Sequence, residues 1–308
     1  MPAATNAYYS GDNTPNWPQT NKEEKGQSKL TQKPVLHFAH ANGMPSAVYA
    51  PFFDGLAEFF TIEYIPMLGE TSGYPVDNNW RSLTQQVIDS VAESCKRHGV
   101  TQVVAVGHSL GALCTLQALY REPKHFNQAV LMDPPLIYGR SSFLMHVAKT
   151  LDKVPMMNHR LMDKISPSGI SKHRRDVWDS RDDAYEQMRH KTFFKNFDER
   201  SFQGYIEHGL HERADGKVTL AISKKNEVAV FRTNPSMYWL TPNEGPKPPA
   251  QLIIGEESIF LKRKFPQQVK ARLGIDFQTH AGGHMFPLEH PESVSALVLD
   301  IIEQQLSQ

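Results

Sequence analysis

The fold of this 308-residue chain is decided by the stretch QVVAVGHSLG, residues 102–111. Its first half is apolar and β-branched, which is typical of a strand buried on both faces of a sheet. Its second half places glycines two positions before and two positions after Ser109, and residues 112–120 have the composition of a helix. A strand that passes into a helix at a serine predicts a sharp, strained turn with the hydroxyl projecting above the sheet edge.

Strand and helix patterns alternate on both sides of this stretch. Short apolar runs of the kind that form buried strands occur at residues 34–39, 60–65, 129–132 and 251–255, with a further candidate at 276–279. Apolar residues spaced three and four apart predict amphipathic helices at 82–98 and 294–306. The alternation predicts an α/β fold with a mostly parallel central sheet and helices on both faces.

The character of the sequence changes in its middle third. Residues 136–249 carry many charges and helical patterns, and 218–222 is their one short strand pattern. We therefore expect one α/β core, residues 31–135 and 250–308, interrupted by a largely helical cap at 136–249. Residues 1–30 are too polar to offset the entropy of ordering, and we expect an N-terminal tail there.

Composition excludes several functional classes. Lys and Arg total 33, as do Asp and Glu, so the chain has no net charge and is a poor candidate for a sequence-independent nucleic-acid binder. Two cysteines exclude a disulfide framework, and the histidines lack metal-ligand spacing, so we expect neither a metal nor another cofactor. No secretory signal or membrane-spanning stretch is recognisable, which favours a cytoplasmic protein.

A serine hydroxyl becomes a useful nucleophile only beside a base, which in turn needs an orienting acid. We expect Ser109 to be the nucleophile and His284 to be the base, because His284 follows two glycines after the candidate strand at 276–279 and precedes the C-terminal helix. The nearest rival is His290, which lies just before Pro291 at a helix start. That position predicts a structural role for His290.

Four motifs occur together in the order HANGMP (40–45), GHSLG (107–111), LMDP (131–134) and GGHMFP (282–287). With them the chain resembles the α/β-hydrolase superfamily, in particular its capped, esterase- or lipase-like branch, over its whole length except the N-terminal tail. The resemblance implies an oxyanion hole with one donor at the backbone N–H of Leu110. It implies a second donor in the first motif, at the N–H of Met44, or at that of Asn42 if His40 and Ala41 take the His-Gly role.

The acid is where the sequence departs from the commonest family pattern. Many relatives place an Asp shortly after the strand that corresponds here to 252–254, and this chain has Ser258 there. One alternative is that a neighbouring carboxylate, Glu256 or Glu257, substitutes. The other is Asp133, because some relatives, the haloalkane dehalogenases among them, carry the acid at the end of that earlier strand.

Chemical reasoning favours Asp133 as the acid. It ends an apolar strand, on the same rim of a parallel sheet as Ser109. A carboxylate buried at such a position is costly unless it has a partner, and His284 would be one. We therefore expect a triad of Ser109, His284 and Asp133.

The cap is rich in apolar side chains that could form an acyl pocket, since small-molecule sites are mostly apolar. They comprise Phe143, Leu144, Met145, Val147, Leu151, Val154, Met156, Met157, Leu161, Met162, Trp178, Tyr185, Phe193, Phe194, Phe197, Phe202, Tyr205, Tyr238 and Trp239. For each of them, ordinary packing inside the cap is the alternative. The basic cluster at 172–175 is expected on a solvated face.

Together, the residues and the resemblance predict a serine hydrolase that cleaves a small carboxylic ester with an apolar acyl part. A serine at the elbow implies an acyl-enzyme, whereas relatives with an aspartate there attack carbon. Two alternatives stay open. One is cofactor-free chemistry on the same scaffold, by a carbon–carbon hydrolase, a lyase or an oxygenase, and the other is a relative that binds a ligand without catalysis.

Overall fold

The computed structural model describes residues 33–154, 156–237 and 248–306. The expected N-terminal tail and the cap residues Tyr238 and Trp239 lie outside this part. The core of the described chain is a six-stranded sheet of β1 (Val35–Ala39), β2 (Thr61–Tyr64), β3 (Val103–His108), β4 (Phe126–Met132), β8 (Ala250–Gly255) and β9 (Asp276–His280). The strand order is β2-β1-β3-β4-β8-β9, and every pairing is parallel.

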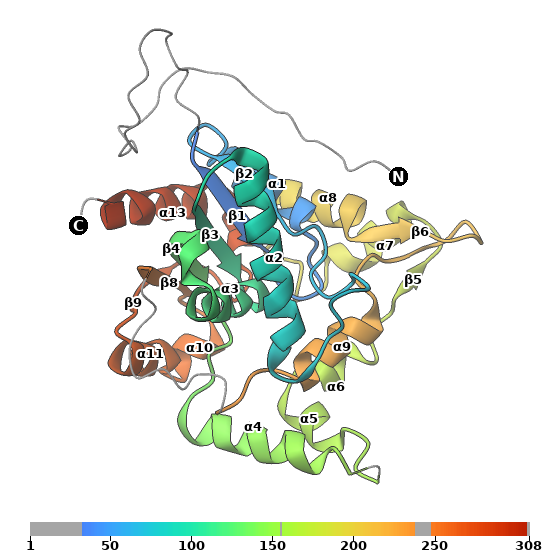
Figure 1. Ribbon diagram of the computed structural model, residues 1–308. Helices are drawn as coiled ribbons and strands as arrows, with labels where there is room; N and C mark the ends of the chain where they lie inside the picture. The colour runs from blue at the N-terminus through green and yellow to red at the C-terminus, as the bar shows by residue number, and fades with distance from the viewer. Residues whose placement is uncertain (1–32, 155, 238–247, 307–308) are drawn as a thin grey trace, which may run out of the picture.

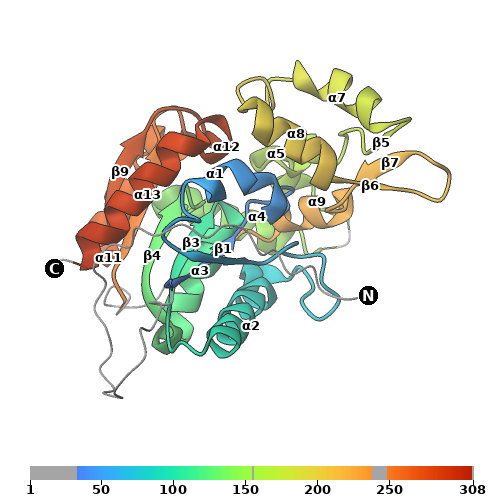
Figure 2. The same cartoon turned by 90° about the horizontal axis from the view of Figure 1, so that it is seen from above.

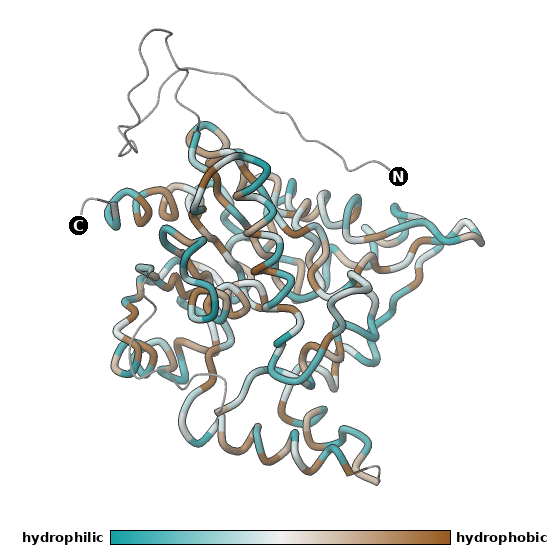
Figure 3. Tube along the Cα trace, in the orientation of Figure 1, coloured by the Kyte–Doolittle hydropathy of each residue, from teal (hydrophilic) through white to brown (hydrophobic). Residues whose placement is uncertain are grey.

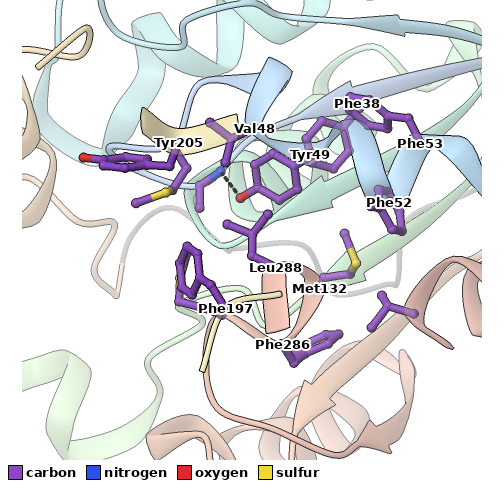
Figure 4. Packing of buried hydrophobic residues seen from close by; sticks show 14 of the residues in the cluster. Phe38, Val48, Tyr49, Phe52, Phe53, Met132, Phe197, Tyr205, Phe286 and Leu288 are labelled. Carbon is purple, nitrogen blue, oxygen red and sulfur yellow. Dashed lines mark hydrogen bonds between the residues drawn. The ribbon is translucent and has the colours of Figure 1, made fainter. Parts of the chain in front are cut away.

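Helices cover both faces of this sheet (Figures 1 and 2). One face carries α1 (Ala50–Asp54) and α13 (Pro291–Leu306), and the other carries α2 (Arg81–His98), α3 (Leu110–Arg121) and α11 (Phe265–Leu273). Side chains of a strand alternate between the two faces. In β1, Leu36 and Phe38 pack on the first side, shown from close by in Figure 4, whereas Val35 and Ala39 pack on the second. The α/β fold predicted from the sequence is confirmed.

The topology brings several loops to one edge of the sheet. From β1 the chain moves outward to β2 and then returns to β3, on the opposite side of β1. The loops that follow β1 and β3 therefore leave toward opposite sides, and sites of open parallel sheets generally form where the strand order reverses in this way. The loops after β4, β8 and β9 begin at this same edge, because all six strands are parallel.

The segment between β4 and β8 is largely helical. It contains α4 (Gly139–Leu151), α5 (Arg160–Ile165), α6 (Ser168–Ser171), α7 (Arg181–Arg189), α8 (Glu199–His208) and α9 (Lys224–Arg232). It also contains an antiparallel sheet in the order β5 (Val177–Trp178), β7 (Val218–Leu220) and β6 (Leu210–Glu212). The pattern at 218–222 predicted β7. It did not predict β5, which has only two residues, or β6, which is polar at two of its three positions, because neither forms an apolar run.

Shorter elements complete the connections. They are the 3-10 helices η1 (Ser46–Tyr49), η2 (Asn78–Trp80) and η3 (Pro123–His125), and the short α-helices α10 (Ile259–Lys262) and α12 (Phe286–Glu289). Among the described residues, no helix combines the length and the apolar composition that crossing a membrane would require.

Candidate active site

Ser109 stands at a strained turn between β3 and α3. Its backbone has φ 53° and ψ −113°, a left-handed φ that non-glycine residues rarely adopt. The flanking glycines allow this turn. A Cβ on Gly107 would lie 2.6 Å from the Cα of Ala112, and a Cβ on Gly111 would lie 2.1 Å from the carbonyl oxygen of Ala39. The turn therefore depends on glycine at both positions.

Three side chains from distant parts of the sequence form a line of hydrogen bonds. The Nε2 atom of His284 lies 2.8 Å from Oγ of Ser109, and its Nδ1 atom lies 2.5 Å from Oδ2 of Asp133. Because the carboxylate accepts, Nδ1 carries the imidazole proton and Nε2 accepts the serine hydroxyl proton. This is the arrangement in which a neutral imidazole can take the proton of a serine.

Asp133 lies where β4 ends, with φ 43° and a fully buried side chain. Its N–H donates to the carbonyl oxygen of Ile253 in the neighbouring strand, at 2.8 Å. The hydroxyl of Ser258 donates to Oδ2 at 2.7 Å, so this oxygen has two donors. The other oxygen, Oδ1, is buried and has no hydrogen-bond partner within the described chain. The protein thus directs the accepting capacity of Asp133 toward one oxygen.

The other candidates for acid and base lie differently. Glu256 and Glu257 are exposed, and neither carboxylate is bonded to His284 in the described structure. His290 directly precedes α13, and its ring lies beside the ring of His280, with centroids 5.8 Å apart. The structure therefore brings Asp133 and His284 together with Ser109, and it leaves Glu256, Glu257 and His290 outside the line.

The loop after β1 supplies backbone N–H groups beside the turn. The N–H of Gly111 donates to the carbonyl oxygen of His40 at 3.0 Å, which fixes this loop against the start of α3. The N–H of Met44 donates to the carbonyl oxygen of Ala41 at 3.1 Å, so the donor expected at Met44 is already engaged in a turn. The N–H of Asn42 has no acceptor within the described chain.

The hydrogen bonds therefore favour the alternative alignment, in which His40 and Ala41 take the His-Gly role and Asn42 follows them. The N–H of Leu110, the first residue of α3, also has no acceptor in the described residues. Two unpaired N–H groups thus belong to the two segments that the resemblance indicated. The oxyanion role of Leu110 stays a prediction. The turn hydrogen bond of Met44 favours the alternative, the N–H of Asn42, as the second candidate donor.

Two buried histidines hold these segments in place. Nδ1 of His40 donates to the carbonyl oxygen of Ala41 at 2.8 Å, and Nε2 accepts the N–H of Leu68 at 2.6 Å. Burial lowers the pKa of His40 to about 4 and that of His108 to about 3, where the nearby His284 adds to the effect. Both rings are therefore neutral near pH 7, each with one donor and one acceptor nitrogen.

His108 links His284 to the loop that follows β1. Its Nε2 donates to the backbone carbonyl oxygen of His284 at 2.9 Å, so its Nδ1 accepts the hydroxyl proton of Tyr49 at 2.7 Å. The Tyr49 oxygen accepts the N–H of Ala41 at 3.3 Å, the dashed line in Figure 4. Sequence reasoning missed both residues. The sequence offered a signal only for His108, which directly precedes Ser109 in the GHSLG motif.

The inserted segment contributes a polar cluster beside the same loop. The side chain of Asn42 donates to the carbonyl oxygen of Glu227 at 3.0 Å. The Glu227 carboxylate accepts from Arg174 at 2.6 Å, and the guanidinium also donates to the hydroxyl of Tyr205 at 3.1 Å. The expectation that the basic cluster at 172–175 is wholly solvated is wrong for Arg174, whose side chain is only 22% exposed.

The described residues contain no candidate metal site. Among residues 33–154, 156–237 and 248–306, no group of three or more His, Cys, Asp or Glu side chains is placed to hold an ion. Cys95 and Cys114 are buried, and burial raises the pKa of both thiols. The polar groups around Ser109 instead form a proton-transfer line with adjacent N–H donors.

Comparison with known proteins concerns the family and the fold. A family model described as the alpha/beta hydrolase family matches residues 38–297. The search of curated proteins found no match. Among solved structures, an E-2-(acetamidomethylene)succinate hydrolase is 16% identical with a TM-score of 0.68, covering 88% of this chain and 92% of that one.

Two further solved structures are similar. The peroxisomal alpha-beta-hydrolase Lpx1 of Saccharomyces cerevisiae is 17% identical, with a TM-score of 0.68 and coverage of 90% of this chain and 78% of that one. An M. tuberculosis esterase is 16% identical, with a TM-score of 0.60 and coverage of 88% and 86%. At these identities the likeness shows a shared fold. The match of the family model over most of the sequence shows more: the chain belongs to the alpha/beta hydrolase family.

Proposed function

We propose that this protein is a serine hydrolase that cleaves carboxylic esters through an acyl-enzyme intermediate. The observation that carries the proposal is the continuous line from Ser109 Oγ to His284 Nε2 and from His284 Nδ1 to Asp133 Oδ2, with separations of 2.8 and 2.5 Å. A hydroxyl that can pass its proton to a neutral, carboxylate-oriented imidazole is a nucleophile suited to acyl transfer.

In the first half of the reaction, Ser109 Oγ attacks the ester carbonyl carbon, and its proton moves to Nε2 of His284. The buried Asp133 carboxylate stabilises the resulting imidazolium. The carbonyl oxygen becomes an oxyanion, which the N–H groups of Leu110 and Asn42 would bind. When the tetrahedral intermediate collapses, the bond to the alcohol oxygen breaks, and that oxygen takes the proton from Nε2.

In the second half, water repeats the same steps on the acyl-enzyme. His284 removes a proton from the water, whose oxygen attacks the acyl carbon. The second intermediate then collapses, the bond to Ser109 Oγ breaks, and Oγ recovers the proton. The products are a carboxylic acid and an alcohol, and no cofactor takes part.

The substrate-binding role of residues 136–249 is part of this proposal. Several aromatics expected for an acyl pocket, including Trp178, Phe194, Phe202 and Tyr205, are buried in the same apolar cluster as β1 and α13. They anchor the insertion to the core beside the candidate site. The polar cluster of Arg174 and Glu227 then lies where it would contact a substrate that enters past Asn42.

A carbon–carbon hydrolase, lyase or oxygenase on the same scaffold is the second candidate class. Its support is a similarity of fold to the E-2-(acetamidomethylene)succinate hydrolase, whose named substrate contains no carboxylic ester. The proton-transfer line at Ser109 supports acyl transfer more directly. It also disfavours the alternative that this protein binds a ligand without catalysis, because binding alone requires no such line.

The test is hydrolysis of a panel of p-nitrophenyl esters of increasing acyl length by wild type and by Ser109→Ala. We expect wild-type turnover, with a decrease in kcat of about 10³-fold or more in the variant. Ser94→Ala, which removes another buried serine hydroxyl, should retain turnover. Equal rates for wild type and Ser109→Ala, or no turnover of any ester by folded wild type, would overturn the proposal.

A further inference from the structure

Helix α4 presents an apolar face to solvent. Its inner face holds Met145 and Ala148, which pack with Met162 of α5 in a small cluster of their own. Its outer face has Leu144 (63% exposed) and Leu151 (48% exposed), which are seven residues apart and therefore on the same side of the helix, with Phe143 (54% exposed) adjacent to Leu144. A stripe of large apolar residues on the outside of a helix has a hydration cost that binding a partner would remove.

Exposed apolar side chains also occur beyond α4, in the loop that follows it and in α5 and α6. Of the large apolar side chains that are exposed in the described chain, seven fall between residues 143 and 170: Phe143, Leu144, Leu151, Val154, Met156, Ile165 and Ile170. We call this set the apolar patch. Apolar stretches recur along this part of the trace in Figure 3, at the end of the insertion farthest from α8.

The exposed charges within residues 136–172 are all positive. Residues 136–172 contain six Lys or Arg and two Asp. Five of the cations are exposed, namely Arg140, Lys153, Arg160, Lys164 and Lys172. Neither Asp side chain faces solvent freely. Asp152 is buried and accepts the N–H groups of Leu161 and Met162, and the 8%-exposed side chain of Asp163 is paired with Arg232 and Lys172.

We propose that the apolar patch and its exposed cations form a docking surface for an anionic lipid bilayer. Apolar side chains enter the boundary between headgroups and acyl chains while the surrounding cations meet lipid phosphates. A second copy of this chain fits less well, because two patches of this kind would bring cations against cations. Nucleic acid would leave the apolar side chains in water. The proposal does not depend on the chemistry proposed for Ser109.

The test is co-sedimentation of the full chain with vesicles of phosphatidylcholine, or of phosphatidylcholine mixed with phosphatidylglycerol. We expect binding to the mixed vesicles, weakened by added salt, and little binding to phosphatidylcholine alone. Phe143→Ser and Lys164→Glu should each weaken binding measurably, by about threefold or more. Circular dichroism checks that each variant is folded.

Each variant has a matched control. Phe193→Ser removes a phenylalanine that is 48% exposed outside the patch, and Lys96→Glu reverses an exposed lysine that, like Lys164, is in the last turn of its helix. Both controls should bind as wild type does. The proposal would be overturned if the protein bound neither kind of vesicle, or if patch and control variants lost binding equally. It would also be overturned if the patch joined two copies in a dimer that Phe143→Ser dissociates. Co-sedimentation measures vesicle binding and not ester hydrolysis, so its outcome is independent of the Ser109→Ala result.

Discussion

Ser258 donates its hydroxyl proton to Oδ2 of Asp133, the same oxygen that accepts from His284. The strands before these two residues, β8 and β4, are direct neighbours in the sheet. Side chains from both strand ends therefore reach the same place beside the imidazole. In the family pattern an Asp is common at the later position. Here a hydroxyl stands there and supports a carboxylate from the earlier one.

Removing this hydroxyl should weaken the orientation of Asp133. We expect Ser258→Ala to lower kcat for p-nitrophenyl ester hydrolysis by about tenfold with little change in KM, because a hydrogen bond to a charged group contributes about 1.5–3 kcal/mol. Ser258→Thr keeps the hydroxyl and should restore most of the rate. Steady-state kinetics of the two variants measures the difference.

Ser258 also caps α10, and this second role needs its own control. Its side chain accepts the N–H of Phe260, as the side chain of Ser180 accepts an N–H at the start of α7. Ser180→Ala removes a comparable cap far along the chain and should leave kcat unchanged. If Ser258→Ala keeps the wild-type kcat, the hydroxyl does not position Asp133.

The identity of the acid can be tested directly. Asp133→Asn removes the charge that stabilises the imidazolium, so kcat should fall by about 10²- to 10⁴-fold. Glu257→Gln changes an exposed carboxylate that has no bond to His284 and should behave as wild type. The assignment of Asp133 is wrong if Asp133→Asn retains turnover and Glu257→Gln loses it.

The bonds from Tyr49 to His108 and to Ala41 give a third prediction. Tyr49→Phe leaves Nδ1 of His108 and the N–H of Ala41 without partners in a buried place. We expect kcat to fall by about tenfold, since an unsatisfied buried group costs about 1–3 kcal/mol and both affected loops carry reacting groups. Pre-steady-state acylation kinetics measures the change.

Tyr74→Phe is the matched control for Tyr49→Phe, because it removes an exposed tyrosine hydroxyl that is bonded to Asp89. It should leave acylation unchanged. A merely destabilising effect of Tyr49→Phe would lower the free energy of unfolding without altering the acylation rate of the folded fraction. That result would remove Tyr49 from the positioning of the site.

Acid should destabilise the protein through its buried histidines. Burial lowers the pKa of His37 and His40 to about 4 and that of His108 to about 3, against 6.5 for a free imidazole. Between about pH 7 and pH 5 the unfolded chain binds protons at these groups and the folded chain does not. The free energy of unfolding should therefore fall as pH falls, by about 2 kcal/mol for each histidine.

Urea unfolding at about pH 7 and pH 5 measures this loss of free energy. Both pH values lie above the range in which most carboxylates titrate. His37→Gln, which can keep a hydrogen bond to Ser90, should reduce the loss by about one third of the three-histidine total. A free energy of unfolding that is equal at the two pH values would contradict the prediction.

The glycine at the end of the motif allows a prediction about folding. A Cβ on Gly111 would lie 2.1 Å from the backbone oxygen of Ala39, an atom that the sheet holds in place. Gly111→Ala should therefore destabilise the chain by about 3 kcal/mol or more, seen as lower soluble yield and an earlier urea midpoint. Gly73→Ala meets no atom within 4 Å and should behave as wild type.

The sequence by itself predicted the elements of the core and two members of the hydrogen-bonded line, Ser109 and His284. Continuous apolar runs and apolar spacings of three and four residues are local properties, so they predicted β1 to β4, α2 and α13. The strand-to-helix turn singled out Ser109 because glycines two positions to each side are read directly from the chain. The placement of His284 after the last strand followed from the same order of elements.

Tertiary structure alone decided the choices that depend on contacts between distant segments. Ser109 and His284 are 175 residues apart, and whether Asp133 or a later carboxylate completes their line depends on which strand ends are adjacent. The preference for Asn42 over Met44 as a candidate donor depends on a turn hydrogen bond, and the contacts of Tyr49 depend on the buried ring of His108 at the end of β3. Apolar content likewise did not show which cap residues are buried and which face solvent, because burial is set by what packs against them.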